Sequence, residues 1–563
     1  MDYTKQMISN ETGERIQNAL RSINIPKVDD VRGSITLPTT IDGLPETQIT
    51  WTSSDPAIVS DKPNGKIAPG VVRRPPVGAA PAQVTLTASV AIKSEPKITV
   101  DFSRDFQLTV QPSVKLAPYS SYGMVNFARS NSHRGQQVYM AYSVGNDGTR
   151  WKAANSGQPI LTSTKGVHAV RDPSLIRSRE GDRFFLLATD LNVDGVEYGW
   201  RGWDWAQSGS SRYIEVWESH DLRTWSNQRH ILVAPPEAGM TFAPEAIWDP
   251  EIEAYVVFWT SSMYPVDTYF TEDPNDPKRR YPLSRNQTLY ATTRDFITFT
   301  KAKVMSGRPN HGTLDACMIY EEETGYYHRF VCDRISTGVG VTRYASGCPT
   351  DDIYQERSGR VLAPEEDWQL IACCITHRAM NTTYAEAPLV FQANPNDQRG
   401  KGYYFFSDQI WADSPAGHPM EEQLHPYWTS CLSSGQWTPI EWTQKPEYEG
   451  SQGVIRHGTV INLTPADHAA VRGADLVSIS VQVLAKITCI TGEPLDSSAL
   501  VVTAKYSDAV AETLGEGYGG YILSGSGPWL TPGRYTVGVS YTVLEVTQTA
   551  SFEVEVMERS AAF

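Results

Sequence analysis

Hydrophobic and polar positions follow one another along this chain in short runs that predict β-strands rather than helices. Segments such as RFFLLATDL, AYVVFWTSS and GYYFFSD are apolar and aromatic throughout, which is typical of buried strands. Five predicted inner strands open with an ionizable residue and recur about every 70 residues, a period that indicates radial β-repeats. They read DPSLI at Asp172, EAIWD at Glu245, DACMI at Asp315, EAPLV at Glu386 and HGTVI at His457.

The fifth repeat is divided between the two ends of this region. HGTVINLT supplies its inner strand from the C-terminal side, and YGMVNFAR and QVYMAYSVGNDGTRW supply the next strands from the N-terminal side. Closing a ring in this way removes the exposed edges of the sheets. The sequence therefore predicts an all-β fold in which residues 118–465 form a five-bladed β-propeller. The alternative is a set of unrelated antiparallel sheets.

Shorter alternating strands flank the repeats on both sides. Residues 26–115 contain ITWTSSDPAIVS and QVTLTASVAI, and residues 475–563 contain PGRYTVGVSYTVLEVTQTASFEVEV. Both segments read as small β-sandwiches and resemble bacterial immunoglobulin-like (Ig-like) modules. We expect two Ig-like domains that act as spacers or packing partners, with direct glycan binding as the alternative. Residues 1–25 are expected to be a leader, either a short helix or a disordered segment.

Composition and charge narrow the classes of function. The 563 residues carry a formal net charge of −15, which argues against a nucleic-acid partner. The sequence holds no apolar run of the length that a membrane-spanning helix needs. We expect a secreted or cell-surface protein whose signal peptide has been removed, because Ig-like modules are usual there; a cytoplasmic protein is the alternative. The sequence does not indicate an oligomeric state.

The seven cysteines do not show the spacing of a disulfide framework or of a zinc site. Their number is odd, and they form neither a CxxC pair nor a zinc-binding spacing. We expect most of them to be buried apolar residues, from which no redox compartment follows, and we expect no metal-ligand set.

The repeat carries candidate chemistry. In a closed propeller the innermost strands line a central axis, so four carboxylates and a histidine would converge there. Two carboxylates across a pocket can cleave a glycosidic bond, one donating a proton to the leaving oxygen and the other activating water. A third carboxylate nearby raises the pKa of the acid by repulsion between like charges.

The ordered set of motifs resembles glycoside hydrolase family 43. VRDPSLIRS is similar to the opening blade of that family, TFAPEAIWDP to the second, LDACMIYEEE to the blade with the third acidic residue, YAEAPLVF to the segment with the general acid, and RHGTVINLT to the axial histidine segment. The resemblance implies that Asp172 is the general base, Asp315 the residue that tunes and orients the acid, and Glu386 the general acid of an inverting reaction. Ala387 and Phe242 depart from the usual Gly and Trp of the pattern.

Further polar residues have two interpretations each. Glu245 is expected to bind a substrate hydroxyl or serve as a rival acid, or else to be a structural hydrogen-bond acceptor. His457 binds an axial cation such as Ca²⁺ or a water, or is a structural histidine; no cofactor is required. Arg329 contacts a substrate hydroxyl or pairs with an axial carboxylate. Asp190 is a weaker candidate for the base.

Aromatic residues are candidates for contacts with sugar rings. The insertion at residues 191–211 contains Trp200, Trp203 and Trp205. Tryptophan faces stack on sugars, and tryptophans also anchor loops to a core. We count Trp203 and Phe242 among the expected substrate-binding residues.

These observations predict a secreted, exo-acting glycosidase that acts on an arabinose- or xylose-containing polysaccharide or oligosaccharide. The resemblance favours an α-L-arabinofuranosidase, with a β-D-xylosidase or a galactan-active enzyme of the same family as alternatives. The pattern is also compatible with a propeller that binds glycans without cleaving them, with an adhesin, and with a fructan-cleaving enzyme of family 32. The family 32 enzyme is disfavoured because its Asn-Asp-Pro-Asn-Gly and Glu-Cys motifs do not occur in this chain.

Overall fold

The computed structural model has an all-β fold in which helices are short. In the described part of the chain the helices are α2 (Trp203–Ala206), α3 (Ile375–Met380) and α4 (Pro465–Arg472), and residues 17–22 are helical as well. None of the helices in this part has the length and apolarity that crossing a membrane requires. The structure describes residues 14, 17–40, 47–92, 103–128, 136–193, 200–264, 273, 276, 284–306, 308, 311–334, 347–411, 421–449 and 454–559.

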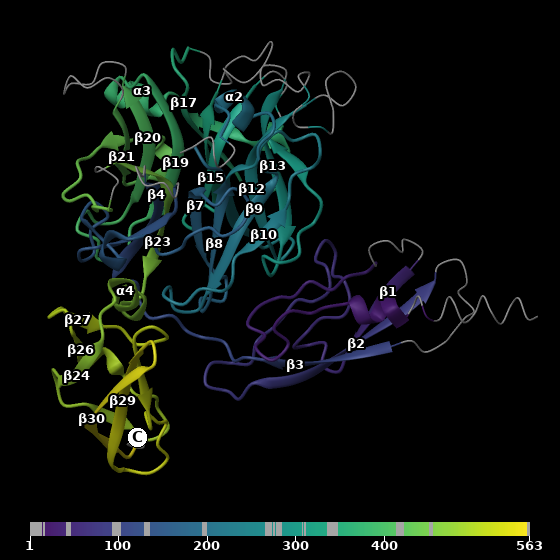
Figure 1. Cartoon of the computed structure of the whole chain (residues 1–563). Coiled ribbons are helices and arrows are strands. Elements are labelled where there is room, and N and C mark those ends of the chain that lie inside the picture. The colour runs from purple at the N-terminus through teal and green to yellow at the C-terminus, as the bar shows by residue number, and fades with distance from the viewer. Residues whose placement is uncertain are drawn as a thin grey trace, which may run out of the picture. The chain divides into compact units, whose positions relative to one another are not determined.

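The described part of the predicted repeat region contains five four-stranded sheets (Figure 1). The first has the order β10-β9-β8-β7, and the next three follow the chain from β11 to β22. The first sheet consists of β7 (Val170–Arg177), β8 (Phe184–Asp190), β9 (Tyr213–Ser219) and β10 (Arg229–Leu232). The second consists of β11 (Phe242–Asp249), β12 (Ala254–Met263), β13 (Arg285–Thr293) and β14 (Lys303–Ser306). The third consists of β15 (Thr313–Glu321), β16 (Tyr326–Asp333), β17 (Asp352–Ser358) and β18 (Gln369–Ala372). The fourth consists of β19 (Tyr384–Gln392), β20 (Tyr403–Trp411), β21 (Glu421–Thr429) and β22 (Thr438–Pro439).

The fifth sheet joins the two ends of this region. Strand β23 (Ile455–Leu463) pairs antiparallel with β4 (Ser121–Ala128), which is followed by β5 (Val138–Ser143) and β6 (Trp151–Ala153). The split repeat of the sequence corresponds to this sheet. Gly458 makes the pairing possible, because a Cβ atom there would lie 1.8 Å from the carbonyl oxygen of Val125.

Inner strands β7, β15 and β19 have β-bulges near their first residues, and these bulges change the direction of the side chains there. The register shifts between Arg171 and Ser174 in β7, between Leu314 and Ala316 in β15, and between Glu386 and Leu389 in β19. Left-handed backbone angles accompany these irregularities, with φ of 50° at Asp172, 46° at Asp315 and 56° at Ala387. Such bulges redirect a side chain at the end of a strand and are common next to functional sites.

Neighbouring sheets are tied by a recurring hydrogen bond from an inner strand to the second strand of the preceding sheet. The amide of Ala243 donates to Oγ1 of Thr189 at 2.8 Å, and the amide of Asp315 donates to Oγ1 of Thr260 at 3.0 Å. The amide of His457 donates to Oδ2 of Asp408 at 3.2 Å. These bonds satisfy backbone donors that the kinks free from the strand ladder.

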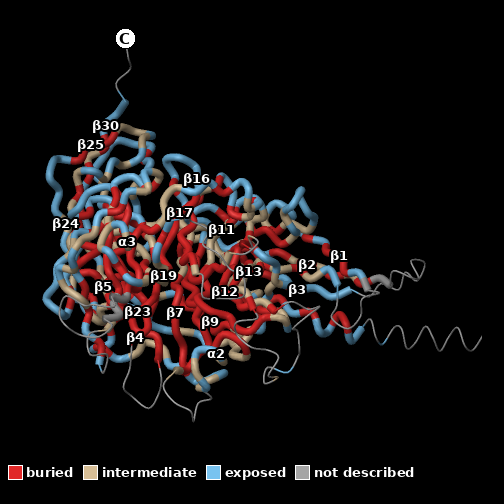
Figure 2. The backbone as a smooth tube through the Cα atoms, turned by 90° about the horizontal axis from the view of Figure 1, so that it is seen from above, coloured by how far each residue is buried: buried red, intermediate tan, exposed pale blue. Residues whose placement is uncertain are grey.

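Hydrophobic cores fill the spaces between successive sheets. Phe330 of the third sheet stacks on Phe405 of the fourth with ring centroids 5.8 Å apart, and Phe391 of the fourth meets Tyr122 of the fifth at 5.4 Å. Val125 and Leu186 belong to the core that the fifth and first sheets share. Buried residues accordingly dominate strands such as β7, β19 and β23 (Figure 2), because apolar side chains on both faces are covered.

The N-terminal unit has its own core. It contains residues 1–114 together with residues 248–256 and 292–300. Its sheet is formed by β1 (Thr47–Ser53), β2 (Ala82–Ile92) and β3 (Ser103–Val110). Leu20, Ile23 and Ile25 are buried in the same core. These residues were expected in a leader, but the structure packs them into the N-terminal module because they bury apolar surface there.

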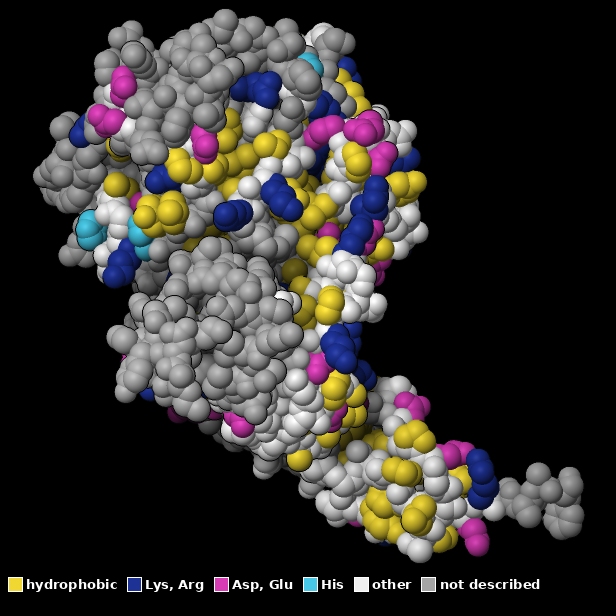
Figure 3. All heavy atoms as spheres, turned by 90° about the vertical axis from the view of Figure 1, so that its right-hand side faces the viewer, with side chains coloured by type: hydrophobic (Ala, Val, Ile, Leu, Met, Phe, Trp, Pro, Cys, Tyr) yellow, Lys and Arg dark blue, Asp and Glu magenta, His cyan; other side chains and the backbone are white. Residues whose placement is uncertain are grey.

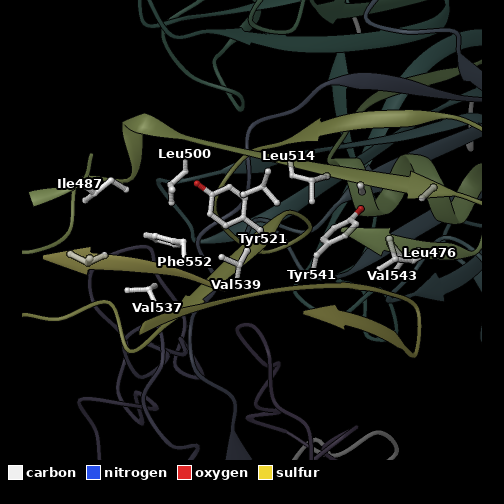
Figure 4. Packing of buried hydrophobic residues seen from close by; sticks show 14 of the residues in the cluster. Leu476, Ile487, Leu500, Leu514, Tyr521, Val537, Val539, Tyr541, Val543 and Phe552 are labelled. Atoms are coloured by element: carbon white, nitrogen blue, oxygen red, sulfur yellow. The ribbon is translucent and has the colours of Figure 1, made fainter. Parts of the chain in front are cut away.

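The C-terminal segment forms two facing sheets. One has the order β24-β26-β27 and the other β25-β30-β29-β28. Their strands are β24 (Leu476–Val483), β25 (Thr488–Ile490), β26 (Leu500–Tyr506), β27 (Ala511–Leu514), β28 (Tyr521–Ser524), β29 (Gly533–Val543) and β30 (Val546–Met557). Figure 4 shows side chains such as Leu514, Tyr541 and Phe552 packed within this core. The alternating strands thus bury one face, as in a β-sandwich.

Two cysteines are joined, which the sequence did not indicate. Cys348 and Cys374 form a disulfide across a separation of 26 residues. We expected buried thiols, and the structure differs because this pair is close in space without any characteristic spacing in the sequence.

The described surface is mixed in character. In the face that Figure 3 presents, basic, acidic and apolar side chains are interspersed. The excess of acidic residues in the sequence is therefore not gathered into one patch on the described part of this face.

Candidate active site

One pocket, with a volume of about 250 Å³, gathers side chains from the inner strands of different sheets. Six of the residues expected in the site line it, namely Asp172, Asp315, Glu386, His457, Trp203 and Phe242. The other described lining residues are Arg171, Leu191, Gln207, Leu314, Arg334, Tyr384, Ala387, Asp408 and Arg456. Inner strands β7, β11, β15, β19 and β23 supply Asp172, Phe242, Asp315, Glu386 and His457 to it.

Asp172 is held in its ionized form. Its Oδ2 accepts a hydrogen bond from Oγ1 of Thr189 at 2.8 Å, and its Oδ1 lies 3.4 Å from Nδ1 of His457. Burial opposes ionization, but His457, Arg171 and Thr189 together more than offset it, so the pKa of Asp172 is lowered. An ionized carboxylate in a pocket can accept a proton from water.

Asp315 has the opposite tendency. Its side chain is buried, and burial, with the negative charges of Glu386 and Asp172, raises its pKa to about 7. The positive charges of His457 and Arg334 limit this rise. Asp315 therefore carries a proton at neutral pH for part of the time, beside a carboxylate that does not.

Glu386 lies within a network of donors. The Tyr384 hydroxyl donates to its Oε2 at 2.5 Å, and Nη2 of Arg456 donates to its Oε1 at 3.3 Å. Nη1 of Arg334 lies 3.6 Å from Oε2 of Glu386 and donates to the Tyr384 hydroxyl at 2.9 Å. The two guanidinium groups and the Tyr384 hydroxyl thus surround the carboxyl group of Glu386 in the pocket. The network therefore sets the position of this carboxyl group.

His457 is positively charged in this setting. Burial alone would lower its pKa, but the contact with Asp172 and the charges of Asp315 and Asp408 raise the pKa to about 9. An imidazolium repels cations, and Ca²⁺ prefers six to eight oxygen ligands. The axial Ca²⁺ that the sequence led us to consider near His457 stays a prediction.

Glu245 lies elsewhere on the inner strands. It lines a separate cavity of about 220 Å³ with residues such as Cys317 and Val460, and it is not among the described residues that line the pocket. Burial, with the charge of Asp315, raises its pKa to about 8, against the opposing charge of His457. Its Oε1 has no hydrogen-bond partner among the described residues. The structure thus separates Glu245 from the three carboxylates of the pocket.

Arg329 is also away from the pocket. Its side chain is fully buried, its Nε donates to Glu356 at 2.7 Å, and its guanidinium lies 4.2 Å from the ring centroid of Trp368. Glu356 belongs to β17, the third strand of its sheet. The expected contact with a substrate hydroxyl or an axial carboxylate is therefore wrong, because Arg329 forms an ion pair between the two middle strands of its sheet.

Asp190 is engaged in a different cluster. Its Oδ1 accepts from the amide of Val167 at 2.9 Å, and its carboxylate lies with Glu215 and His230 in a group that has the composition of a metal site. It does not line the pocket among the described residues. Its hydrogen bonds give it a structural partner instead.

Several pocket residues were missed from the sequence. Arg171 and Arg456 directly precede Asp172 and His457, and Asp408 ends the apolar strand GYYFFSD. Nε of Arg456 donates to Oδ2 of Asp408 at 2.8 Å. The adjacency of the two arginines to axial positions was an available signal, whereas the direction of their side chains depends on the bulges.

The tryptophans of the insertion at residues 191–211 have different environments. Trp203 lines the pocket and is 51% exposed. Trp200 meets Trp203 edge to face with ring centroids 5.1 Å apart, and Trp200 and Trp205 pack against a hydrophobic core that includes Leu191, Ala206 and Phe242. Residues 194–199 of the insertion lie outside the described part. Trp203 is thus presented to the pocket while its neighbours anchor it.

Two family models and one curated protein match the sequence of this chain. The model of a probable glycosyl hydrolase domain, related to family 43, matches residues 117–469, and the model of an atrophied bacterial Ig domain matches residues 16–113. An α-L-arabinofuranosidase of Bifidobacterium longum subsp. longum is 31% identical over 391 residues, which cover 64% of this chain and 34% of that protein. The chain thus spans about a third of the length of the curated relative that it matches.

The likeness to solved structures is weaker. A thermostable family-43 glycoside hydrolase is 14% identical with a TM-score of 0.32, over 68% of this chain and 92% of the other. A putative exo-beta-1,3-galactanase from Bifidobacterium bifidum s17 is 11% identical with a TM-score of 0.34, over 68% and 95% of the two chains. The match of the glycosyl hydrolase model over residues 117–469 exceeds half of the chain, and the chain therefore belongs to the glycosyl hydrolase family that is related to family 43.

Proposed function

We propose that this protein is an inverting, exo-acting glycosidase that removes terminal α-L-arabinofuranosyl units from a polysaccharide or oligosaccharide. The observation that carries the proposal is the meeting of Asp172, Asp315 and Glu386 in one pocket. Three different inner strands supply them, and the pKa is lowered at Asp172 and raised at Asp315. Carboxyl groups whose environments differ in this way can divide the roles of base and acid.

The proposed reaction uses one water molecule. Asp172 removes a proton from the water while the water oxygen attacks the anomeric carbon. The bond from that carbon to the leaving oxygen breaks in the same step. Glu386 donates its proton to the leaving oxygen. Asp315 and the donors around Glu386 set how readily that proton is held. One proton then passes from Asp172 to solvent and another returns to Glu386, which restores the starting state.

The architecture supports action at a chain end. We propose that the five sheets are the blades of a propeller and that the pocket lies where their inner strands begin. A pocket of about 250 Å³ that Trp203 and Phe242 help to line suits one terminal sugar unit better than the middle of a polymer.

The sugar is inferred from sequence similarity. The relative from B. longum is named an α-L-arabinofuranosidase, and 64% of this chain aligns with it. We propose the same sugar here, in an arabinose-containing glycan. The disulfide between Cys348 and Cys374 and the Ig-like module support a secreted or cell-surface location, because disulfides persist in oxidizing compartments.

A panel of substrates tests this proposal. The 4-nitrophenyl α-L-arabinofuranoside, β-D-xyloside and β-D-galactoside are incubated with the wild type, Glu386→Gln and the control Glu366→Gln, which changes an exposed glutamate. We expect hydrolysis of the arabinofuranoside that Glu386→Gln lowers by about 10²-fold or more while the control retains it. Preference for another sugar would correct the substrate. Hydrolysis that does not depend on Glu386 would contradict the proposed site.

A further inference from the structure

Arg171 is a cation of the pocket for which the described residues provide no hydrogen-bond acceptor. Arg171 is buried, with 8% of its surface exposed, and it lines the pocket directly before Asp172. Its guanidinium carbon lies 4.5 Å from the ring centroid of Phe127 and 5.3 Å from that of Trp203. These two aromatic side chains hold the planar group in place through cation–π contacts.

The guanidinium makes no hydrogen bond to the described residues, and its Nε is buried without a partner. The other two arginines of the pocket differ, because Arg334 bonds to Tyr384 and Arg456 bonds to Asp408 and Glu386. Burial lowers the pKa of Arg171, which reflects the loss of water around the charge. An unpaired, buried guanidinium is unfavourable, and a bound acceptor would offset that cost.

The surrounding charges decide what kind of acceptor fits. Asp172, Glu386 and Asp408 act on Arg171 as negative neighbours, and Arg456 acts as a positive one. A sugar that carries a carboxylate would meet these carboxylates and be repelled. A hydroxyl oxygen of a neutral sugar accepts a hydrogen bond without adding charge, and the fork of Arg can reach two adjacent oxygens.

We propose that Arg171 is a substrate-binding and specificity-determining residue that donates hydrogen bonds to the hydroxyl oxygens of an uncharged glycosyl unit in the pocket. Trp203 supports this role by holding the guanidinium and by offering its exposed ring to the same sugar. The inference rests on the proposed function, since it names a contact for the substrate of that pocket.

The first test removes the donor and the acceptor separately. Arg171→Met and Arg171→Lys are compared with wild type on 4-nitrophenyl glycosides of the preferred sugar that each lack one ring hydroxyl. We expect Arg171→Met to lower kcat/KM on the full substrate by about 10- to 100-fold, with partial recovery in Arg171→Lys. For at least one hydroxyl, its removal from the substrate must lower kcat/KM of wild type by a much larger factor than it lowers kcat/KM of Arg171→Met. Equal costs in both proteins for every hydroxyl would overturn the proposal.

The second test does not need turnover. Binding of L-arabinose, D-xylose, D-galactose and D-glucuronate is followed by the shift in Tm and by saturation-transfer NMR. We expect a neutral sugar to bind wild type and the exposed control variant Arg223→Met, and to bind Arg171→Met at least about tenfold more weakly. Tighter binding of glucuronate that depends on Arg171 would overturn the neutral-sugar assignment, and so would neutral binding that Arg171→Met leaves unchanged.

Failure of the sugar contact and failure of the proposed function give different results. Arg171-dependent binding of a sugar by a wild type that hydrolyses no substrate would indicate a binding pocket without catalysis. Glu386-dependent hydrolysis with no effect of Arg171→Met on the folded protein would leave the glycosidase and remove this contact. Equal Tm values of the variants without sugar show that each variant is folded.

Discussion

Nδ1 of His457 lies 3.4 Å from Oδ1 of Asp172, although the two residues come from strands at opposite ends of the repeat region. Strand β23 carries the histidine and contacts β7, which carries the aspartate. Each group favours the charged form of the other, so the pKa of Asp172 is lowered and that of His457 is raised to about 9. The contact between these inner strands thus keeps the proposed base ionized.

Replacing His457 with Gln removes the positive charge beside the base. The pKa of Asp172 should rise, so that Asp172 becomes protonated at a higher pH than in wild type. We expect the acidic limb of the kcat/KM profile to move upward by about 1–3 pH units, the usual effect of an opposite charge at this range. A pH profile measures this shift. The exposed His168→Asn variant is the control, and an acidic limb that stays in place would contradict the pairing.

Asp315→Asn removes a titrating carboxyl group from the pocket. Burial, with the charges of Glu386 and Asp172, raises the pKa of Asp315 to about 7. Asn does not titrate, so the part of the kcat/KM profile that follows the ionization of Asp315 near pH 7 should be lost. Activity at neutral pH should fall by about 10²-fold or more. A profile near pH 7 that matches wild type would show that the ionization of Asp315 does not affect the reaction.

Tyr384→Phe removes a hydrogen bond that positions the proposed acid. The Tyr384 hydroxyl donates to Oε2 of Glu386 at 2.5 Å. A hydrogen bond to a charged group contributes about 1.5–3 kcal/mol, which corresponds to about 10- to 100-fold in rate. We expect kcat/KM of Tyr384→Phe to fall by that factor while the Tm stays close to that of wild type. Unchanged kcat/KM would show that the hydroxyl does not position the acid.

Glu245→Gln should change how stability depends on pH. The pKa of Glu245 in the fold is about 8, above its ordinary value, so its contribution to stability is fully present below about pH 4.3 and is lost as pH rises through 8. The Tm of wild type should therefore fall from pH 6 to pH 9 more steeply than the Tm of Glu245→Gln. Calorimetry compares the two, with the exposed Glu322→Gln as control. Parallel curves would show that Glu245 is ionized throughout this range.

The repeat made the axial residues predictable, because a fixed period places equivalent strand starts at equivalent positions. Asp172, Asp315 and Glu386 could be selected in this way. The direction of each side chain could not, since it depends on bulges whose register is set by the neighbouring strand. Glu245 occupies an equivalent position and lines another cavity.

The repeat pattern does not predict which side chains contact one another away from the strand starts. Arg329 was expected near the axis, but its ion pair with Glu356 depends on how the two middle strands of the third sheet pair. Arg171 precedes an axial residue, and only the packing of Phe127 and Trp203 around it reveals an unpaired donor. The disulfide of Cys348 and Cys374 depends on a close approach that no sequence spacing encodes.

The stereochemistry of the product tests the central claim most directly. Hydrolysis of 4-nitrophenyl α-L-arabinofuranoside, or of whichever sugar the panel selects, is followed by ¹H NMR from the first minutes, before the anomers equilibrate. With Asp172 as base and Glu386 as acid, water attacks the face opposite the leaving group, and the first product should carry the inverted, β configuration. A first product of α configuration would require a covalent intermediate and would contradict this assignment of the two carboxylates.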